Sequence, residues 1–338
     1  MTNNSSPQPV AATQHLPHTL LNFSDYDLWV LEIFLNVGLG LSLGVLGVVV
    51  NILNLLVLSR HNLKETTNIM LLSLSSLDLF YSITSIFLRL PSLIKLIDPY
   101  FAITYQTFIK LAVLMPNAVC FVITILHVTA IGIERAIAVL FPFHVSRIFT
   151  PYRAKWMLLA LYLFGSIPVW PYYYRFTYRW VFVPSIKKTI AVLAYTDFFV
   201  NNMTIILDYV NYFVNNTTTT IPIIIVFICS TLIIFQLTQL KRKGLSGRSS
   251  KQVKEIKVVK MLLVVCLVSF MVLVPEHVIN TYLTTHFEEL SWNFYDLIVY
   301  LIPVTYQVNS CVNFFIYITM SSKFAETYKT LIHGSSKK

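Results

Sequence analysis

Charged side chains interrupt apolar stretches of this sequence at three places where they could do chemistry. Glu134 and Arg135 stand side by side at the end of one long apolar run, in GIERAIAVLFPFH. Asp78 lies inside LLSLSSLDLFYSI with no basic residue within a helical turn, and Glu276 and His277 share a third run. A carboxylate among apolar side chains must find polar partners, bind an ion or take up a proton. These residues are therefore candidate functional sites.

The apolar runs that carry these residues have the length of membrane-spanning helices. Of the 338 residues, 56% are hydrophobic and only 12% charged, and the mean hydropathy is +0.68. Crossing a bilayer takes about 20 helical residues, and the backbone in lipid must satisfy its own hydrogen bonds. Seven apolar blocks therefore predict an all-α membrane protein, a seven-transmembrane helix bundle. They lie at residues 31–59, 67–94, 104–139, 154–174, 218–240, 256–284 and 294–319.

The blocks divide the chain into three parts. Residues 1–30 form a predicted extracellular tail, 31–319 the seven-helix transmembrane domain, and 320–338 a cytosolic amphipathic helix and tail. In SSKFAETYKTLI the apolar residues recur at helical spacing, which predicts a short helix on the inner membrane surface. The longest predicted loop, 175–217, is rich in aromatic residues, and we expect it to fold over the outer mouth.

Basic residues predict the orientation of the chain in the membrane. Lys and Arg concentrate in the loops after the first, third and fifth blocks and in the tail. By the positive-inside rule the N-terminus is extracellular and the C-terminus cytosolic, as in a multi-pass plasma-membrane protein. Glycosylation sequons lie on the predicted outer side, at Asn3, Asn4, Asn22, Asn202, Asn215 and Asn216. The net charge of +10 is thus a topology signal, and no nucleic-acid partner is expected.

Ordered motifs across the blocks resemble those of rhodopsin-like (class A) G-protein-coupled receptors over residues 30–332. NIMLLSLSSLDL matches the second-helix pattern and gives Asp78, and ERA matches the acidic-Arg-Tyr triplet that ends the third helix. NFFIY matches N-P-x-x-Y and gives Asn313 and Tyr317. Each motif alone is weak, but their order and spacing are specific. Three stretches further resemble molluscan chemosensory-type and orphan peptide-type receptors: HNLKETTNIMLLSLSSLDL, IERAIAVLFPFHVSRIFTPYRA and NSCVNFFIYITMSSKFAETYKTL.

The resemblance implies a receptor that binds an extracellular ligand, a peptide or small chemosensory molecule, and activates a heterotrimeric G protein. Arrestin and kinases would be further partners, beside the lipid bilayer. The coupling switch would use Glu134, Arg135, Glu255, Asn313 and Tyr317. Glu134 and Glu255 would hold Arg135 until the sixth helix swings outward. The alternative is a static ion pair that caps the third helix.

The resemblance also implies two sites within the bundle. No cofactor is required, but an allosteric sodium ion would be bound by oxygen atoms, which suit a hard cation. Its ligands would be Asp78, Thr124, Asn309 and Ser310, and the alternative is a carboxylate hydrogen-bonded to water. The ligand pocket would be lined by Arg89, Asn117, Phe121, Glu276, His277, Asn280, Tyr306 and Gln307. Glu276 and His277 could instead pair with neighbouring helices or with Arg89.

Several positions depart from the family pattern. The expected third-helix cysteine, fifth-helix tyrosine, sixth-helix tryptophan and N-P-x-x-Y proline are replaced by Lys110, Ser230, Leu273 and Phe314. The loop 175–217 has no cysteine, so the disulfide that usually holds it is absent. Amine receptors have an aspartate where this chain has Asn117, and opsins have a lysine at Gln307; both classes are therefore disfavoured.

Two other functions are alternatives to a receptor. A membrane transporter or channel with a polar path through the bundle is the alternative, and the ordered motif set argues against it. An intramembrane enzyme would need a metal or nucleophile cluster. HExxH, GxSxG and paired catalytic aspartates are absent from the sequence, so no enzymatic activity is expected.

Overall fold

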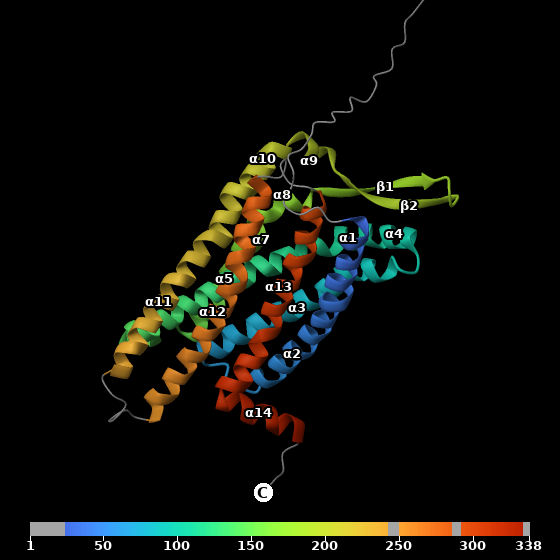
Figure 1. The fold of residues 1–338 in the computed structure, drawn as a ribbon. Coiled ribbons are helices and arrows are strands. Elements are labelled where there is room, and N and C mark those ends of the chain that lie inside the picture. Colours follow the sequence, from blue (N-terminus) through green and yellow to red (C-terminus); the bar gives the residue numbers. More distant parts are fainter. Residues whose placement is uncertain (1–23, 243–249, 286–291, 334–338) are drawn as a thin grey trace, which may run out of the picture.

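The computed structural model describes residues 24–242, 250–285 and 292–333. For some of these residues, among them Glu255, Asn280 and Asp296, it describes the backbone alone. Seven helical segments traverse one bundle, which confirms the predicted fold class (Figure 1). The first four are α1 (Asp25–Glu32), η1 (Ile33–Leu41) and α2 (Ser42–Leu58) in one run; α3 (Thr66–Ile94); α4 (Pro99–Ile109), η2 (Lys110–Leu114) and α5 (Met115–Leu140); and α7 (Pro151–Ser166). The last three are α10 (Met203–Asp208), η4 (Tyr209–Val214), η5 (Asn216–Thr220) and α11 (Ile221–Arg242); α12 (Ser250–Thr285); and α13 (Trp292–Met320).

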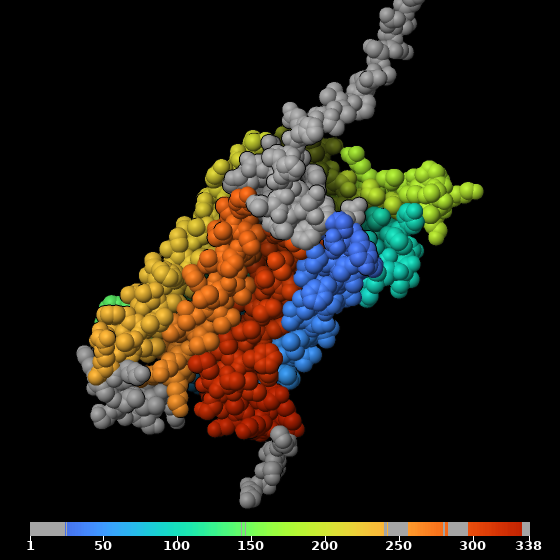
Figure 2. All heavy atoms as spheres, in the orientation of Figure 1, coloured from blue at the N-terminus to red at the C-terminus, as the bar shows by residue number. Residues whose placement is uncertain are grey.

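Short elements connect these segments: α6 (Pro142–Ile148), η3 (Ile167–Val169), α8 (Trp170–Tyr173) and α9 (Asp197–Asn201). Six of the seven segments are long and apolar enough to cross a membrane, while α7 has 16 residues. Figure 2 shows α2, α13, α12 and α11 side by side across one face, in agreement with their mutual contacts.

Side-chain caps fix where several helices begin. The Asp98 carboxylate accepts hydrogen bonds from the backbone nitrogens of Tyr100 and Phe101, and Pro99 occupies the first helical position of α4. Thr150 caps α7 in the same manner. These side chains satisfy the first N–H groups of a helix, which have no partner within it.

Prolines reshape the helices without ending them. Proline lacks an N–H and its ring clashes with the carbonyl four residues earlier. The π-helical stretch η2 ends directly before the first turn of α5, which contains Pro116, and η5 stands in the same relation to Pro222 in α11. A π-helical turn admits an extra residue and so relieves such a clash. Pro91, Pro275 and Pro303 lie inside α3, α12 and α13.

The predicted start of the fifth helix at residue 218 is wrong, because the helical segment begins at Met203. Ile206, Val210, Val214 and Thr218 are spaced by four and are all buried, so they form one helical face against the bundle. The threonine hydroxyls donate to backbone carbonyls one turn earlier, as Thr218 does to Val214 at 2.9 Å. The polar run NNTTTT hid this helix, so Asn215 and Asn216 are helical and not in a loop.

The first half of the predicted loop forms an antiparallel hairpin of β1 (Phe176–Val183) and β2 (Lys188–Tyr195). It extends to one side of the bundle beside α4, so the expected position over the outer mouth is wrong (Figure 1). The Thr107 hydroxyl donates to the Ala191 carbonyl at 3.1 Å, and the Ala191 N–H donates to Thr104 Oγ1 at 3.3 Å. These bonds hold the hairpin without the disulfide usual at this place.

A short helix, α14 (Ser322–His333), follows the seventh segment (Figure 1). It lies across the end of the bundle that the sequence predicts to face the cytosol, which is called the inner end below, and the opposite end the outer end. Phe324 is 2% exposed and its ring lies edge-on to Phe314, with ring centres 6.0 Å apart. Phe314 also packs edge-on against Tyr328 at 5.6 Å. The phenylalanine that replaces the motif proline therefore joins α13 to α14. All four cysteines are buried and unpaired.

Candidate functional site

At the inner end of α5, Arg135 is held by two side chains. Its Nη2 lies 2.6 Å from Glu134 Oε1, and Nε donates to Oε2 at 3.3 Å. Nη2 also donates to Thr67 Oγ1 on α3 at 2.6 Å. The expected acid on α12 is Glu255, whose side chain lies outside the described part, so this contact remains a prediction. Thr67 could not be identified from the sequence, since a hydroxyl at the start of an apolar block carries no distinctive signal.

Asp78 occupies the centre of a buried polar network that joins three helices. Its Oδ2 accepts a hydrogen bond from Asn313 Nδ2 at 2.8 Å, and its main-chain carbonyl accepts from Ser310 at 3.1 Å and Ser82 at 2.7 Å. Asn51 Nδ2 donates to the Ser310 carbonyl at 3.1 Å and so adds α2 to the network. The exposed fraction of Asp78 is 2%, so nearly all of its contacts are internal.

The four predicted sodium ligands meet at one small cavity. Its volume is about 10 Å³, which is room for a single water molecule or ion. The lining residues are Asp78, Tyr81, Phe121, Thr124, Tyr306, Asn309 and Ser310. One carboxylate and three neutral oxygen groups are the ligand types that a hard monovalent cation prefers, so the residues fit the expected ion.

Gln307, a predicted ligand-pocket residue, belongs to the buried polar network around Asp78. Its Nε2 donates to Ser82 Oγ at 2.8 Å, and the residue has no exposed surface. Gly47 makes room for this contact, because a Cβ there would lie 2.4 Å from Ser82 Oγ and 2.5 Å from Gln307 Nε2. Ser82 was missed in the sequence, where it is one of several serines in its block.

The structure brings some of the predicted ligand-pocket residues together. The rings of Phe121 and Tyr306 stack with centres 3.8 Å apart, and both border the cavity beside Asp78. Glu276 is buried, and its carboxylate interacts with the Tyr306 hydroxyl. Aromatic rings from α5 and α13 and a carboxylate from α12 thus form one layer in the outer half of the bundle.

The remaining predicted pocket residues lie apart from this layer or have partners of their own. Asn117 Nδ2 lies 2.8 Å from Thr84 Oγ1 and 3.1 Å from Ser85 Oγ, which ties α5 to α3. His277 Nε2 lies 2.9 Å from Thr220 Oγ1 on the fifth segment. Glu276 and His277 therefore contact neighbouring helices, and neither has an ion pair with Arg89 within the described residues. The side chain of Asn280 lies outside the described part.

Arg89 is a buried cation in the outer half of α3. It is 5% exposed, and its Nη1 donates to the Ser85 carbonyl at 3.3 Å. Its Nε and Nη2 have no hydrogen-bond partner among the described residues. The guanidinium lies against Gly40, where a Cβ would come within 2.4 Å of Nε. A buried, unpaired charge costs several kcal/mol, so this arrangement is unusual in a protein core.

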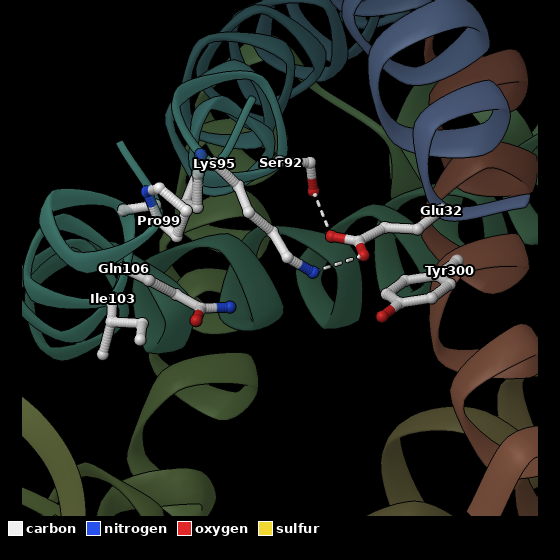
Figure 3. Close-up of a pocket in the computed structure, with 9 residues that line it drawn as sticks. Glu32, Ser92, Lys95, Pro99, Ile103, Gln106 and Tyr300 are labelled. Carbon is white, nitrogen blue, oxygen red and sulfur yellow. Dashed lines mark hydrogen bonds and ion pairs between the residues drawn. The ribbon is translucent and has the colours of Figure 1, made fainter. Parts of the chain in front are cut away.

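A larger cavity opens at the outer end, between α1, α3, α4 and α13 (Figure 3). Its volume of about 360 Å³ is within the range of small-molecule sites. Glu32 accepts from Lys95 Nζ at 2.9 Å and from Ser92 Oγ at 3.0 Å, and Gln106 and Tyr300 line other sides. Glu32 and Lys95 are not among the predicted site residues, although opposite charges at the outer ends of two neighbouring blocks are a usable signal in the sequence.

Comparison with known proteins adds one match and one absence. A family model described as "7 transmembrane receptor (rhodopsin family)" matches residues 50–317, which is most of the chain. The matched region includes Asp78, the Glu134–Arg135 pair and Asn313, and it ends at Tyr317. No curated protein matches the chain.

Proposed function

Since the chain belongs to the rhodopsin family of seven-transmembrane, G-protein-coupled receptors, we propose that Arg135 couples an outer ligand site to the nucleotide exchange of a heterotrimeric G protein. The family implies a multi-pass plasma-membrane protein with an extracellular ligand and a G protein as partner. The finer proposal is an N-terminus outside, a cytosolic C-terminus, and a peptide or small chemosensory molecule as ligand. No catalytic chemistry is part of this function.

The observation that carries the proposal is the double restraint on Arg135. Its guanidinium is bound to Glu134 and to Thr67, on two different helices, and its side chain is 11% exposed. An arginine held between helices can be released when those helices separate, and the freed cation can then bind a partner. Such a bistable element is what a conformational switch needs.

Ligand binding can reach the Asp78–Asn313 network through polar and aromatic contacts. Tyr306 interacts with Glu276 on α12 and stacks on Phe121 of α5. The same two rings border the cavity beside Asp78, which is hydrogen-bonded to Asn313. A ligand that moves Tyr306 would therefore disturb the network that joins α3 to α13.

A sodium ion in the cavity beside Asp78 would neutralise the carboxylate when bound. Asp78 would supply the charge, and Thr124, Asn309 and Ser310 would supply neutral oxygens. An ion that binds one conformation of the bundle better than another stabilises that conformation by the difference in affinity. We assign it the role of favouring the inactive state.

Other parts of the proposal rest on sequence alone. Arrestin and kinases would act on the inner face, where Ser246 and Ser249 lie in a basic loop outside the described residues. Glycosylation is proposed for Asn3, Asn4 and Asn22, which also lie outside them, and for Asn202. Asn215 and Asn216 are poorer acceptors, since both lie in a regular helical segment.

Guanine-nucleotide exchange in membranes that express the chain tests the proposal directly. Each of a panel of G proteins is measured without ligand, against Arg135→Ala at matched surface expression. Exchange that exceeds untransfected membranes and vanishes in Arg135→Ala supports a receptor that signals through this residue. Exchange that is equal in the two proteins contradicts the role of Arg135, and a transporter would likewise not depend on it.

A further inference from the structure

Arg89 stands out because every other buried charge in the described part of the bundle has a partner. Asp78 accepts from Asn313, Glu134 pairs with Arg135, and Glu276 interacts with the Tyr306 hydroxyl. At the outer end, Glu32 is taken by Lys95 and Ser92. Each of these four described acids is therefore engaged with another residue.

The guanidinium is also short of hydrogen bonds. Of its three nitrogens, Nη1 donates to the Ser85 carbonyl at 3.3 Å, while Nε and Nη2 have no partner among the described residues. Folding has nevertheless accommodated the side chain, because Gly40 leaves the space that the guanidinium occupies. The Arg89 guanidinium is thus a buried donor that lacks acceptors among the described residues, in a space that Gly40 leaves open for it. Such a donor indicates an acceptor that comes from outside the chain.

The surroundings of Arg89 lie close to the proposed ligand site. Ser85, which accepts from Arg89 through its carbonyl, also lies 3.1 Å from the Asn117 amide of α5. The next turn of α3 toward the cytosol carries Tyr81, which borders the small cavity together with Phe121 and Tyr306. An acceptor bound to Arg89 would therefore touch the layer that links the outer half of the bundle to Asp78.

We propose that Arg89 binds an anionic group of the ligand, and that the receptor's ligand is accordingly an acid of the carboxylate type. This rests on the proposed function, in that the same outer site is the ligand site. The planar guanidinium fork matches the two oxygens of a carboxylate, and burial strengthens the pairing. The stored cost of the unpaired cation is recovered when the acid binds, which favours acidic over neutral ligands.

Thermal unfolding of the purified full chain tests this proposal without any G protein. The probes are acetate and benzoate, each compared with its neutral amide, at fixed sodium concentration and ionic strength. The proposal predicts that the carboxylates raise the unfolding temperature of the wild type, increasingly with concentration, and that the amides do not. The rise is absent in Arg89→Met and persists in Arg179→Met, which removes an exposed arginine of β1.

The same variants supply a second readout. Without added carboxylate, Arg89→Met is expected to unfold several degrees above the wild type, since it removes an unpaired buried charge and keeps the apolar stem. A lower unfolding temperature would overturn the proposal, as would an equal carboxylate effect in Arg89→Met or none in the wild type. Failure of nucleotide exchange alone would leave these results intact and would bear on coupling only.

Discussion

Asn313 Nδ2 lies 2.8 Å from Asp78 Oδ2, so one hydrogen bond joins α13 to α3 at the centre of the bundle. The carboxylate is 2% exposed and borders a cavity with room for a single ion. This bond fixes one carboxylate oxygen, and Thr124, Asn309 and Ser310 line the same cavity as the carboxylate. The relationship connects the two helices whose inner ends carry Thr67 and Tyr317.

Asp78→Asn is predicted to abolish stabilisation by sodium. The substitution keeps the size of the side chain but removes the charge that the cation needs. Wild-type protein should unfold at a higher temperature in sodium chloride than in choline chloride. The free energy of unfolding should rise by about 2.7 kcal/mol when the sodium concentration is about 100 times the dissociation constant. Asp78→Asn should show no difference between the two salts. An equal sodium effect in both proteins would exclude this cavity as the ion site.

Gly47→Ala is predicted to destabilise the receptor, because the added methyl group would displace Ser82 and Gln307 from their hydrogen bond. Overpacking of this kind costs roughly 1–3 kcal/mol. Gly38→Ala is the matched control on the same segment, since its nearest neighbouring atom would be 3.8 Å away. We expect thermal unfolding to show a loss for Gly47→Ala alone. Equal stability of the two variants would argue against the close packing at Gly47.

Docking of α14 is predicted to weaken below pH 6.5. His61, in the first inner loop, lies 3.2 Å from Thr327 Oγ1 and edge-on to Phe324. Burial, and next the positive charge of Lys323, lower the pKa of His61 from its ordinary value of 6.5. As the pH falls, His61 is therefore protonated at a higher pH when α14 is undocked than when it is docked. The stabilisation of docked α14 by neutral His61 is thus complete above pH 6.5 and is lost as the pH falls toward the lowered pKa.

Hydrogen exchange across residues 322–333 measures this effect, after correction for the intrinsic dependence of exchange on pH. We expect faster exchange at pH 5.5 than at pH 7.5 in the wild type. His61→Gln retains a polar contact to Thr327 but does not titrate, so its exchange should be the same at both values. A pH effect of the same size in His61→Gln would assign it to another group.

The sequence predicted those features that arise from local composition. Apolar blocks of sufficient length gave the seven helices, and the spacing of Phe324, Tyr328 and Leu331 gave α14. The helix from Met203 was hidden, because four threonines and two asparagines look like a loop unless their hydroxyls and amides bond to the preceding turn. The aromatic composition of residues 176–195 is compatible both with a cover over the outer mouth and with a hairpin at the side of the bundle. Only the contacts with α4 determine which position the hairpin takes.

The candidate site divides in the same way. Residues with rare types in apolar surroundings, such as Asp78 and Arg135, were found from sequence. Their partners Thr67 and Ser82 were missed, since a serine or threonine in an apolar block most often bonds to its own helix. Which hydroxyl lies beside a charge depends on how the helices pack, and that relation is set by contacts distant in sequence.

Thr67→Val is predicted to raise ligand-independent nucleotide exchange. It removes the hydrogen bond at 2.6 Å that ties Arg135 to α3 and keeps the shape of the side chain. A hydrogen bond to a charged group contributes about 1.5–3 kcal/mol, so an increase of roughly three- to tenfold is expected when part of it favours the inactive state. Thr66→Val is the control, because its hydroxyl donates to the Phe149 carbonyl instead.

The most direct measurement combines this release with loss of the arginine. Nucleotide exchange is compared among wild type, Thr67→Val, Arg135→Ala and the double variant, in membranes with equal surface expression. If Arg135 transmits the signal, Thr67→Val raises exchange on at least one G protein and the double variant falls to the level of Arg135→Ala. Exchange in the double variant that equals Thr67→Val, or no exchange from Thr67→Val on any G protein, would contradict the assignment of Arg135 as the switch.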